Sequence, residues 1–247
     1  MAVAFALAII AFLYASVGHA GATGYIAIFA LANYSATLLK PLALILNIAV
    51  ASVGCWNFLR AGHFPEPKFA ALYGLSIPAA FIGGLLNLPG LWFEKIVGVL
   101  LLLSGLCLVE KPKDPINLQH VQLPLLFLAG GLLGLLAGFT GTGGGIFLTP
   151  LLLLTRWCNT RGAAAVSVLF ILLNSLAGFA GLLLSKPTAA AELLRGPMLL
   201  WLPIVFISGA IGSRLGSSYW PVKWIRYTLA IVLAIAGCKL LGIHWYS

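Results

Sequence analysis

The chain has 247 residues, of which 62% are hydrophobic and 8% are charged, whereas a soluble domain is about 45–50% apolar and about 25% charged. This composition excludes an ordinary soluble protein and a disordered one, because it leaves too little charge to cover a surface in water. The formal net charge of +9 comes from Lys and Arg residues scattered singly between apolar stretches, which indicates membrane topology signals and argues against nucleic-acid binding.

The first apolar stretch, residues 1–39, contains no charged residue and is too long for one membrane span of about 20 residues. Because it has no basic n-region and continues beyond the length of a signal peptide, we interpret it as a retained membrane segment. The sequence GHAGATG, Gly18–Gly24, interrupts it, and the flanking residues 2–17 and 24–33 are each too short to cross alone. The segment is therefore either one interrupted span or a re-entrant hairpin.

Further uncharged stretches follow at 41–59, 69–93 and 96–109, and we interpret them as spans. The sequence EKPKD at 110–114 is the most polar point of the chain and predicts a central loop. We therefore divide the chain into three parts: a first transmembrane repeat (1–109), a central polar loop (110–120) and a second transmembrane repeat (121–247).

The second half repeats the organisation of the first. The sequence GFTGTGG, Gly138–Gly144, aligns with GHAGATG. The sequences IPAAFIGG at Pro78 and LPIVFISG at Pro203 also align, and Trp92 pairs with Trp220. An internal duplication built from broken helices is a signature of secondary transporters.

Lys and Arg residues discriminate between the two models of the interrupted segments. If both segments cross the membrane, the basic residues divide evenly between its sides; if both are hairpins, one side holds the majority. We therefore favour hairpins over crossing broken helices. The prediction is an all-α integral membrane protein with about seven or eight transmembrane elements in two inverted repeats. Both termini lie outside, and a compact chain of this kind suits the cytoplasmic (inner) membrane of a prokaryote as a multi-pass protein.

The densest chemical signal is AGFTGTGGGIFLTP, Ala137–Pro150. Four glycines in five residues do not form a stable helix interior, and non-helical backbone at membrane depth is tolerated only inside packed protein or around a polar cavity. Backbone N–H groups ahead of a new helix at about Ile146 form an anion-binding concavity, to which Thr140 and Thr142 add hydroxyl donors. The spacing matches neither a P-loop nor a dinucleotide-binding fingerprint.

Close helix packing is the alternative use of these glycines. Gly130, Gly134 and Gly138 have the small-xxx-small spacing of packed membrane helices. We assign this ladder to packing and the cluster 141–145 to a loop that lines a ligand.

Neutral polar residues lie in the spans that follow the two glycine loops. Asn47 lies in the first half, and Ser167, Asn174 and Ser175 lie in the second. Their amides and hydroxyls bind an oxyanion without a permanent countercharge, which would trap it, but they can equally hold helices together. The candidate substrate-binding residues are Thr140, Gly141, Thr142, Gly143, Gly144, Gly145, Gly21, Thr23, Gly24, Asn47, Ser167 and Asn174.

Two further positions carry charge or can acquire it near the spans. His19 in the first glycine loop is a candidate for proton coupling, because an ionisable group at membrane depth indicates function; the alternative is a neutral His that donates to an interior carbonyl. Lys40, Arg161 and Arg214 lie at span edges. We interpret these three as topology anchors, with attraction of anions toward a vestibule as the alternative.

The second-half motif Gly134-x-x-x-Gly138-x-x-Gly141-x-Gly143-Gly144-Gly145-x-x-x-x-Pro150, followed by a span with a polar residue, resembles the TauE/SafE family of sulfite exporters. The resemblance extends over the chain in length, number of spans and duplication. It implies export or uptake of small sulfur-containing anions, of the sulfite, sulfate, thiosulfate and sulfoacetate type. The first loop departs from the glycine-rich pattern at Ala20 and Ala22, and His19 is additional.

The function expected is secondary transport of such an anion, bound by backbone amides of the glycine loops near the membrane centre and moved by alternating access. An anion channel and a non-transporting membrane scaffold subunit are the alternatives. We expect no enzyme, metal or cofactor, since the sequence has no HExxH and no carboxylate within a span. The partners expected are the small anion and the lipid bilayer, with a coupled proton and a homodimer as further options, and no nucleic acid.

Overall fold

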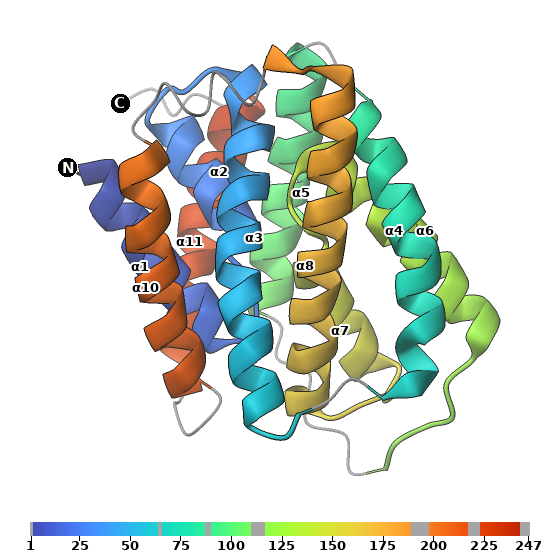
Figure 1. The fold of residues 1–247 in the computed structure, drawn as a ribbon. Helices are drawn as coiled ribbons and strands as arrows, with labels where there is room; N and C mark the ends of the chain where they lie inside the picture. The colour runs from blue at the N-terminus through green and yellow to red at the C-terminus, as the bar shows by residue number, and fades with distance from the viewer. Residues whose placement is uncertain are drawn as a thin grey trace.

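The computed structural model describes residues 2–63, 66–86, 90–109, 117–188, 198–216 and 223–242. Within these residues the chain is helical, and no strand occurs among them (Figure 1). In chain order the elements are α1 (Ala2–Ser16), α2 (Ala22–Leu31), α3 (Ala36–Arg60), the 3-10 helix η1 (Pro67–Phe69), α4 (Ala70–Leu85), α5 (Gly90–Val109), α6 (Leu123–Thr140), α7 (Gly145–Leu154), α8 (Thr160–Ser185), α10 (Met198–Gly216) and α11 (Lys223–Leu240). The all-α prediction is confirmed for this part of the chain.

Four of the described helical segments are long and apolar enough to cross a membrane: α3, the continuous segment Pro67–Leu85, α6 and α8. Shorter apolar helices are α1, α2, α7 and the part Leu200–Leu215 of α10. Large apolar side chains face outward, among them Phe5 and Leu154, which are 71% and 70% exposed. An outer surface of this kind requires lipid, so the protein is a multi-pass membrane protein. The total of seven or eight transmembrane elements stays a prediction.

The chain folds back on itself between α1 and α2. The hydroxyls of Tyr14 and Thr23 are hydrogen-bonded at 3.0 Å. A Cβ placed on Gly24 would lie 2.5 Å from Cγ2 of Ile10, so the start of α2 packs directly on α1. α11 ends toward the same end of the bundle at which α1 begins (Figure 1).

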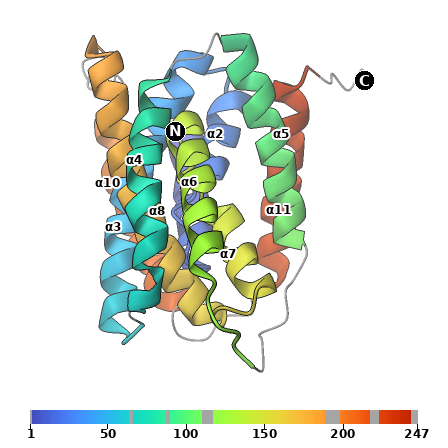
Figure 2. The same cartoon turned by 90° about the vertical axis from the view of Figure 1, so that its right-hand side faces the viewer.

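The chain also folds back between α6 and α7. A Cβ on Gly144 would lie 3.1 Å from the carbonyl oxygen of Leu133 and 3.3 Å from Cβ of Ala137, which places the first turn of α7 beside α6. In Figure 2, α6 ends in the upper part of the view and α7 lies lower down, so the chain turns back between them. Both glycine loops therefore have the geometry of a hairpin tip rather than of a break in a straight helix.

The glycine ladder of α6 lies on the backbone of α4. Cβ atoms placed on Gly130, Gly134 and Gly138 would meet backbone atoms of Leu72, Ser76 and Ala80, respectively. The assignment of these glycines to packing is confirmed. On its other side α4 meets Gly178 and Gly181 of α8 just as closely. α4 is thus clamped between α6 and α8, with backbone against backbone on both sides.

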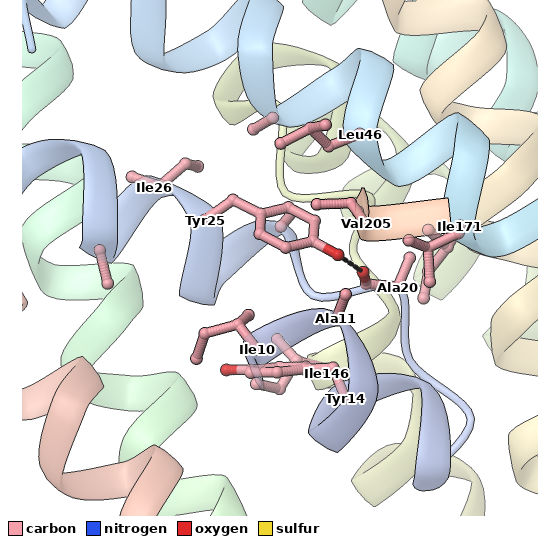
Figure 3. Packing of buried hydrophobic residues seen from close by; sticks show 14 of the residues in the cluster. Ile10, Ala11, Tyr14, Ala20, Tyr25, Ile26, Leu46, Ile146, Ile171 and Val205 are labelled. Carbon is pink, nitrogen blue, oxygen red and sulfur yellow. Dashed lines mark hydrogen bonds between the residues drawn. The ribbon is translucent and has the colours of Figure 1, made fainter. Parts of the chain in front are cut away.

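The first hairpin is embedded in the largest apolar core. Tyr25 is fully buried, and its hydroxyl donates to the carbonyl oxygen of Ala20 at 2.8 Å (Figure 3). Around it lie side chains from distant parts of the chain, including Leu46 of α3, Val205 of α10 and Ile171 of α8. Helices of the second half therefore enclose the hairpin of the first.

The two ten-residue helices α2 and α7 begin in the same way. Their N-cap residues, Gly21 and Gly144, both have left-handed backbone, with φ of 100° and 71°. The sequence alignment had placed Gly24 on Gly144, so the helix starts are shifted relative to that alignment. Residues 110–116 of the predicted central loop and Trp220 of the predicted Trp pair lie outside the described residues.

Candidate functional site

The loop between α6 and α7 is a run of left-handed glycines. α6 ends at Thr140, and Gly141, Gly143 and Gly144 then have φ values of 77°, 72° and 71°. Residues with a Cβ rarely adopt this conformation, so the tight return of the chain requires glycine at these three positions. All of the loop is buried.

The start of α7 presents a row of free donors. Among the described residues, the backbone N–H groups of Gly143, Gly144, Gly145 and Ile146 form no hydrogen bond, although these four residues are buried. The first N–H groups of a helix have no partner inside the helix and carry the positive end of its dipole. Because a buried unpaired donor is costly, the row suits an anion with several acceptor oxygens.

Asn47 of α3 lies over this row. A Cβ placed on Gly143 would lie 2.7 Å from Nδ2 of Asn47 and 3.3 Å from Oγ of Ser175. Nδ2 of Asn47 donates to Oγ of Ser175 at 3.4 Å, and Oδ1 of Asn47 has no partner in the part of the chain that the structure describes. Asn47 was predicted to line the site. Ser175, which touches the loop, belongs to the same polar set but was not among the predicted binding residues.

Asn174 presents a second unpaired oxygen. Its Nδ2 donates to the carbonyl oxygen of Phe170 at 2.8 Å, whereas its buried Oδ1 has no partner among the described residues. Gly178, one turn further along α8, packs on Gly138 of α6. Asn174 therefore lies on the side of α8 that faces α6, which is the arm leading into the glycine loop.

The interpretation of Lys40 as a topology anchor at the membrane surface is wrong. It is only 6% exposed, and its Nζ donates to the carbonyl oxygens of Gly83, Gly84 and Leu86 at 3.1, 3.0 and 3.1 Å. These carbonyls terminate α4, and Lys40 caps them instead of reaching outward to lipid head groups. Its position at a span edge is common for anchors, and only tertiary packing buries it. Arg161 and Arg214 are exposed, as expected.

His19 belongs to a buried chain of polar groups. Its Nδ1 lies 3.2 Å from the carbonyl oxygen of Val17, and its Nε2 lies 3.2 Å from Oγ1 of Thr149. Oγ1 of Thr149 lies 2.7 Å from Oγ of Ser167. The predicted residues His19 and Ser167 are thus brought together through Thr149 of α7, which the sequence analysis did not select. The only signal was one hydroxyl in the apolar run GIFLTP.

The predicted threonines of the second loop satisfy one another. Oγ1 of Thr140 donates to the carbonyl oxygen of Leu136 at 2.6 Å and lies 2.9 Å from Oγ1 of Thr142. The backbone N–H of Thr142 also donates to Oγ1 of Thr140. These hydroxyls therefore stabilise the turn at the end of α6.

The predicted residues of the first loop contact mainly their own hairpin. Thr23 and Gly24 contact α1 through Tyr14 and Ile10, respectively. A Cβ on Gly21 would lie 3.0 Å from the ring of Tyr25. The backbone N–H groups of residues 20–24 form no hydrogen bond among the described residues, so α2 also begins with free donors. Aromatic rings, rather than side-chain amides, surround these N–H groups at the start of α2.

One face of α8 connects the two loops. Gly18 of the first loop packs on Ala164, and His19 reaches Ser167 through Thr149. The second loop packs on Ile171 and Ser175. Since these positions follow one another at helical spacing, the two loops lie on successive turns of α8 rather than at one level.

Comparison with known proteins finds relatives that match nearly the whole chain. A family model described as "Sulfite exporter TauE/SafE" matches residues 3–240. A protein of Sinorhizobium fredii named "Probable membrane transporter protein y4hK" is 34% identical over 243 residues, which cover 96% of each chain. A protein of Methanocaldococcus jannaschii named "Probable membrane transporter protein MJ0441" is 27% identical over 158 residues, 60% of this chain and 57% of that relative. No solved structure is detectably similar.

Proposed function

The chain belongs to the sulfite exporter TauE/SafE family, and from this premise we propose that it is a secondary transporter of small sulfur-containing oxyanions or organosulfonates. The observation that carries the proposal is the row of four buried N–H groups at the start of α7, with the donor Nδ2 of Asn47 facing Gly143 in that row. Sulfite, sulfate, thiosulfate and sulfoacetate present several acceptor oxygens on one small centre, which match such a row.

Asn47 can complete the set of donors. Nδ2 of Asn47 already lies on the side of Gly143, so one N–H of the amide would donate to an oxyanion held there while the other donates to Oγ of Ser175. Thr140, Thr142 and Gly141 hold the shape of the loop, and Gly143, Gly144 and Gly145 supply the amides.

Alternating access would use the two hairpins. We infer that they are re-entrant and belong to two inverted repeats, since each is followed by a long helix and each tip packs on the other half of the chain: Gly18 on Ala164, and Gly141 on Lys40. Rocking of one repeat against the other would open the row of N–H groups to one side of the membrane and then to the other. The setting is a prokaryotic cytoplasmic membrane with both termini outside.

His19 is the candidate for coupling to a proton. In the neutral imidazole, Nδ1–H donates to the carbonyl oxygen of Val17, and Nε2 accepts from Thr149. Protonation turns Nε2 into a donor, so the hydroxyl of Thr149 must reverse and donate to Ser167. Because Thr149 and Ser167 lie on α7 and α8, this reversal carries the protonation state of the first loop to helices that border the second.

The test is flux into liposomes that contain the purified protein. We expect saturable, protein-dependent uptake of radiolabelled sulfite or a related anion, competition by the other members of the class, and a rise in melting temperature with the same anion. Gly144→Val, which forces a side chain into left-handed backbone against Phe170, should abolish both signals. Gly74→Val is the matched control, since no atom lies within 4 Å of its added Cβ.

Three outcomes contradict the proposal in different ways. Flux that rises without saturation indicates an anion channel. Flux equal to that of empty liposomes, with no change in melting temperature, indicates a scaffold subunit. Flux unchanged in Gly144→Val removes the glycine row from the site while leaving transport in place.

A further inference from the structure

Lys40 carries a buried charge without a carboxylate. Its Nζ is held by three carbonyl oxygens at the end of α4. No carboxylate lies within ion-pair distance of Lys40 in the part of the chain that the structure describes. The end of a helix supplies only about half a negative charge, so the ammonium is stabilised but not neutralised. Lys186, near the end of α8, lies close enough to repel it and adds to the positive potential.

The backbone and the start of the side chain of Lys40 lie against the same loop as the row of free N–H groups, while the ammonium lies on the carbonyls of α4. A Cβ placed on Gly141 would lie 3.2 Å from Cα and 3.3 Å from Cγ of Lys40. Asn47 is two helical turns further along α3 and therefore on the same face, and it contacts Gly143. The glycine loop thus runs along one face of α3 from Lys40 to Asn47, a rise of about 10 Å at about 1.5 Å per residue.

A countercharge that can approach and withdraw would strengthen binding of an anion in this loop. Backbone amides and the Asn47 side chain carry no net charge, so a positive charge beside them offsets part of the cost of removing the anion from water. Because the ammonium can return to the carbonyl oxygens at the end of α4, it is not a permanent countercharge of the kind that would trap the anion. A lysine is suited to this role, because its ammonium is a point charge on a flexible stem of four carbons. The stem of Lys40 starts at the loop, and among the described residues its ammonium is engaged by neutral carbonyl oxygens alone.

We propose that Lys40 is the countercharge of the transported anion. Without substrate the ammonium is held by the carbonyls of Gly83, Gly84 and Leu86; with substrate it turns from them toward the anion in the loop 141–144. The inference rests on the proposed function and deepens it, because it names the residue that selects for charge. It follows that a dianion binds better than a monoanion of similar size and shape.

Three variants test this. Lys40→Met removes the charge and the donor. Lys40→Gln removes the charge but keeps an NH2 group for the α4 carbonyls. Lys239→Met is the matched control: Lys239 also caps a helix, donating to the carbonyl oxygen of Leu31 and to Oδ1 of Asn33, but the residue is only half-buried and these hydrogen bonds are exposed. Dissociation constants for sulfate, sulfite and methanesulfonate are measured by thermal shift of each purified protein in detergent.

We expect Lys40→Met and Lys40→Gln to weaken sulfate and sulfite binding about tenfold or more, and methanesulfonate, a monoanion, by a smaller factor. Lys239→Met should stay within about twofold of the wild type for every anion. Equal affinities of Lys40→Gln and the wild type would show that Lys40 is only a helix cap, and so would a loss that is the same for sulfate and methanesulfonate. If Lys40→Met does not fold, Lys40→Gln decides the matter alone. If the wild type binds none of these three anions and neither thiosulfate nor sulfoacetate, the proposed function fails, and this inference fails with it.

Discussion

The two glycine loops have similar backbone geometry, but different side chains surround them. Each starts a ten-residue helix from a left-handed glycine, and each leaves buried N–H groups free at that start. The first loop is lined by Tyr14, Tyr25 and His19, whose polar atoms are engaged in hydrogen bonds. The second is lined by Asn47 and Lys40, of which one has an unpaired oxygen and the other an unneutralised charge. On the proposed function, the second loop would bind the anion and the first would carry the protonation state of His19.

Gly143→Val should give the largest effect on this comparison. Its φ of 72° is unfavourable for valine, at a cost of about 1–3 kcal/mol, and the new Cβ would overlap Nδ2 of Asn47 and Cγ2 of Ile171. We expect flux at the level of empty liposomes with normal insertion into the membrane, measured by uptake and by membrane fractionation. Gly74→Val should transport like the wild type. Uptake that persists in Gly143→Val would mean that the anion does not use this loop.

Asn47→Leu should weaken substrate binding about tenfold, because one donor is lost and about 1–2 kcal/mol of hydrogen bonding to an anion with it. The control is Asn57→Leu on the same helix, whose amide donates to Ser213 and to the carbonyl oxygen of Ala210 of α10. Both variants lose an amide that donates a hydrogen bond, fully buried at Asn47 and half-buried at Asn57, but only Asn47 contacts the glycine loop. Isothermal titration with the bound anion measures the difference, and equal losses in the two variants would make Asn47 merely structural.

His19→Gln should change pH dependence rather than affinity. A histidine can change its charge between about pH 5 and 8, and glutamine keeps hydrogen-bonding groups without titrating. We expect the flux of the wild type to vary across this interval and that of His19→Gln to be flat, with substrate affinity within about threefold. His120→Gln, at an exposed position, is the control. A pH profile that is unchanged in His19→Gln would assign the coupling to another group.

Tyr14→Phe should have the smallest effect. It removes the hydrogen bond between Tyr14 and Thr23 that ties α1 to α2, worth about 1 kcal/mol of stability. Substrate affinity should be unchanged, because this hydroxyl faces its own hairpin. Thermal unfolding in detergent and a binding titration measure the two quantities. A large loss of affinity in Tyr14→Phe would contradict the proposal that the anion binds at the second loop alone.

The sequence predicts those parts of the molecule that depend on local spacing. A ladder of glycines four residues apart predicts close helix packing, and Gly130, Gly134 and Gly138 do lie on α4. A run of glycines predicts a sharp return of the backbone, and three of them have positive φ. In both cases the geometry follows from residues that are neighbours along the chain.

Contacts between distant segments could not be predicted in this way. Lys40 resembles a span-edge anchor, and only the meeting of α3 with the end of α4 buries it. Thr149 resembles any single hydroxyl in an apolar helix until α1, α7 and α8 bring it to His19 and Ser167. Thr23 has a polar side chain at the right level, but Tyr14 engages it. A single sequence does not state which helices become neighbours.

The ladder on α6 gives that helix two unequal sides. At Gly130, Gly134 and Gly138 even a methyl group would meet the backbone of α4, whereas Leu128 and Leu132, 58% and 57% exposed, face outward among other apolar side chains. In a library of random substitutions in α6, the three glycine positions should tolerate no larger residue, whereas the outward-facing positions should tolerate any apolar residue. The outer side can therefore change with the thickness and composition of the membrane, whereas a side chain added on the inner side would have to move α4.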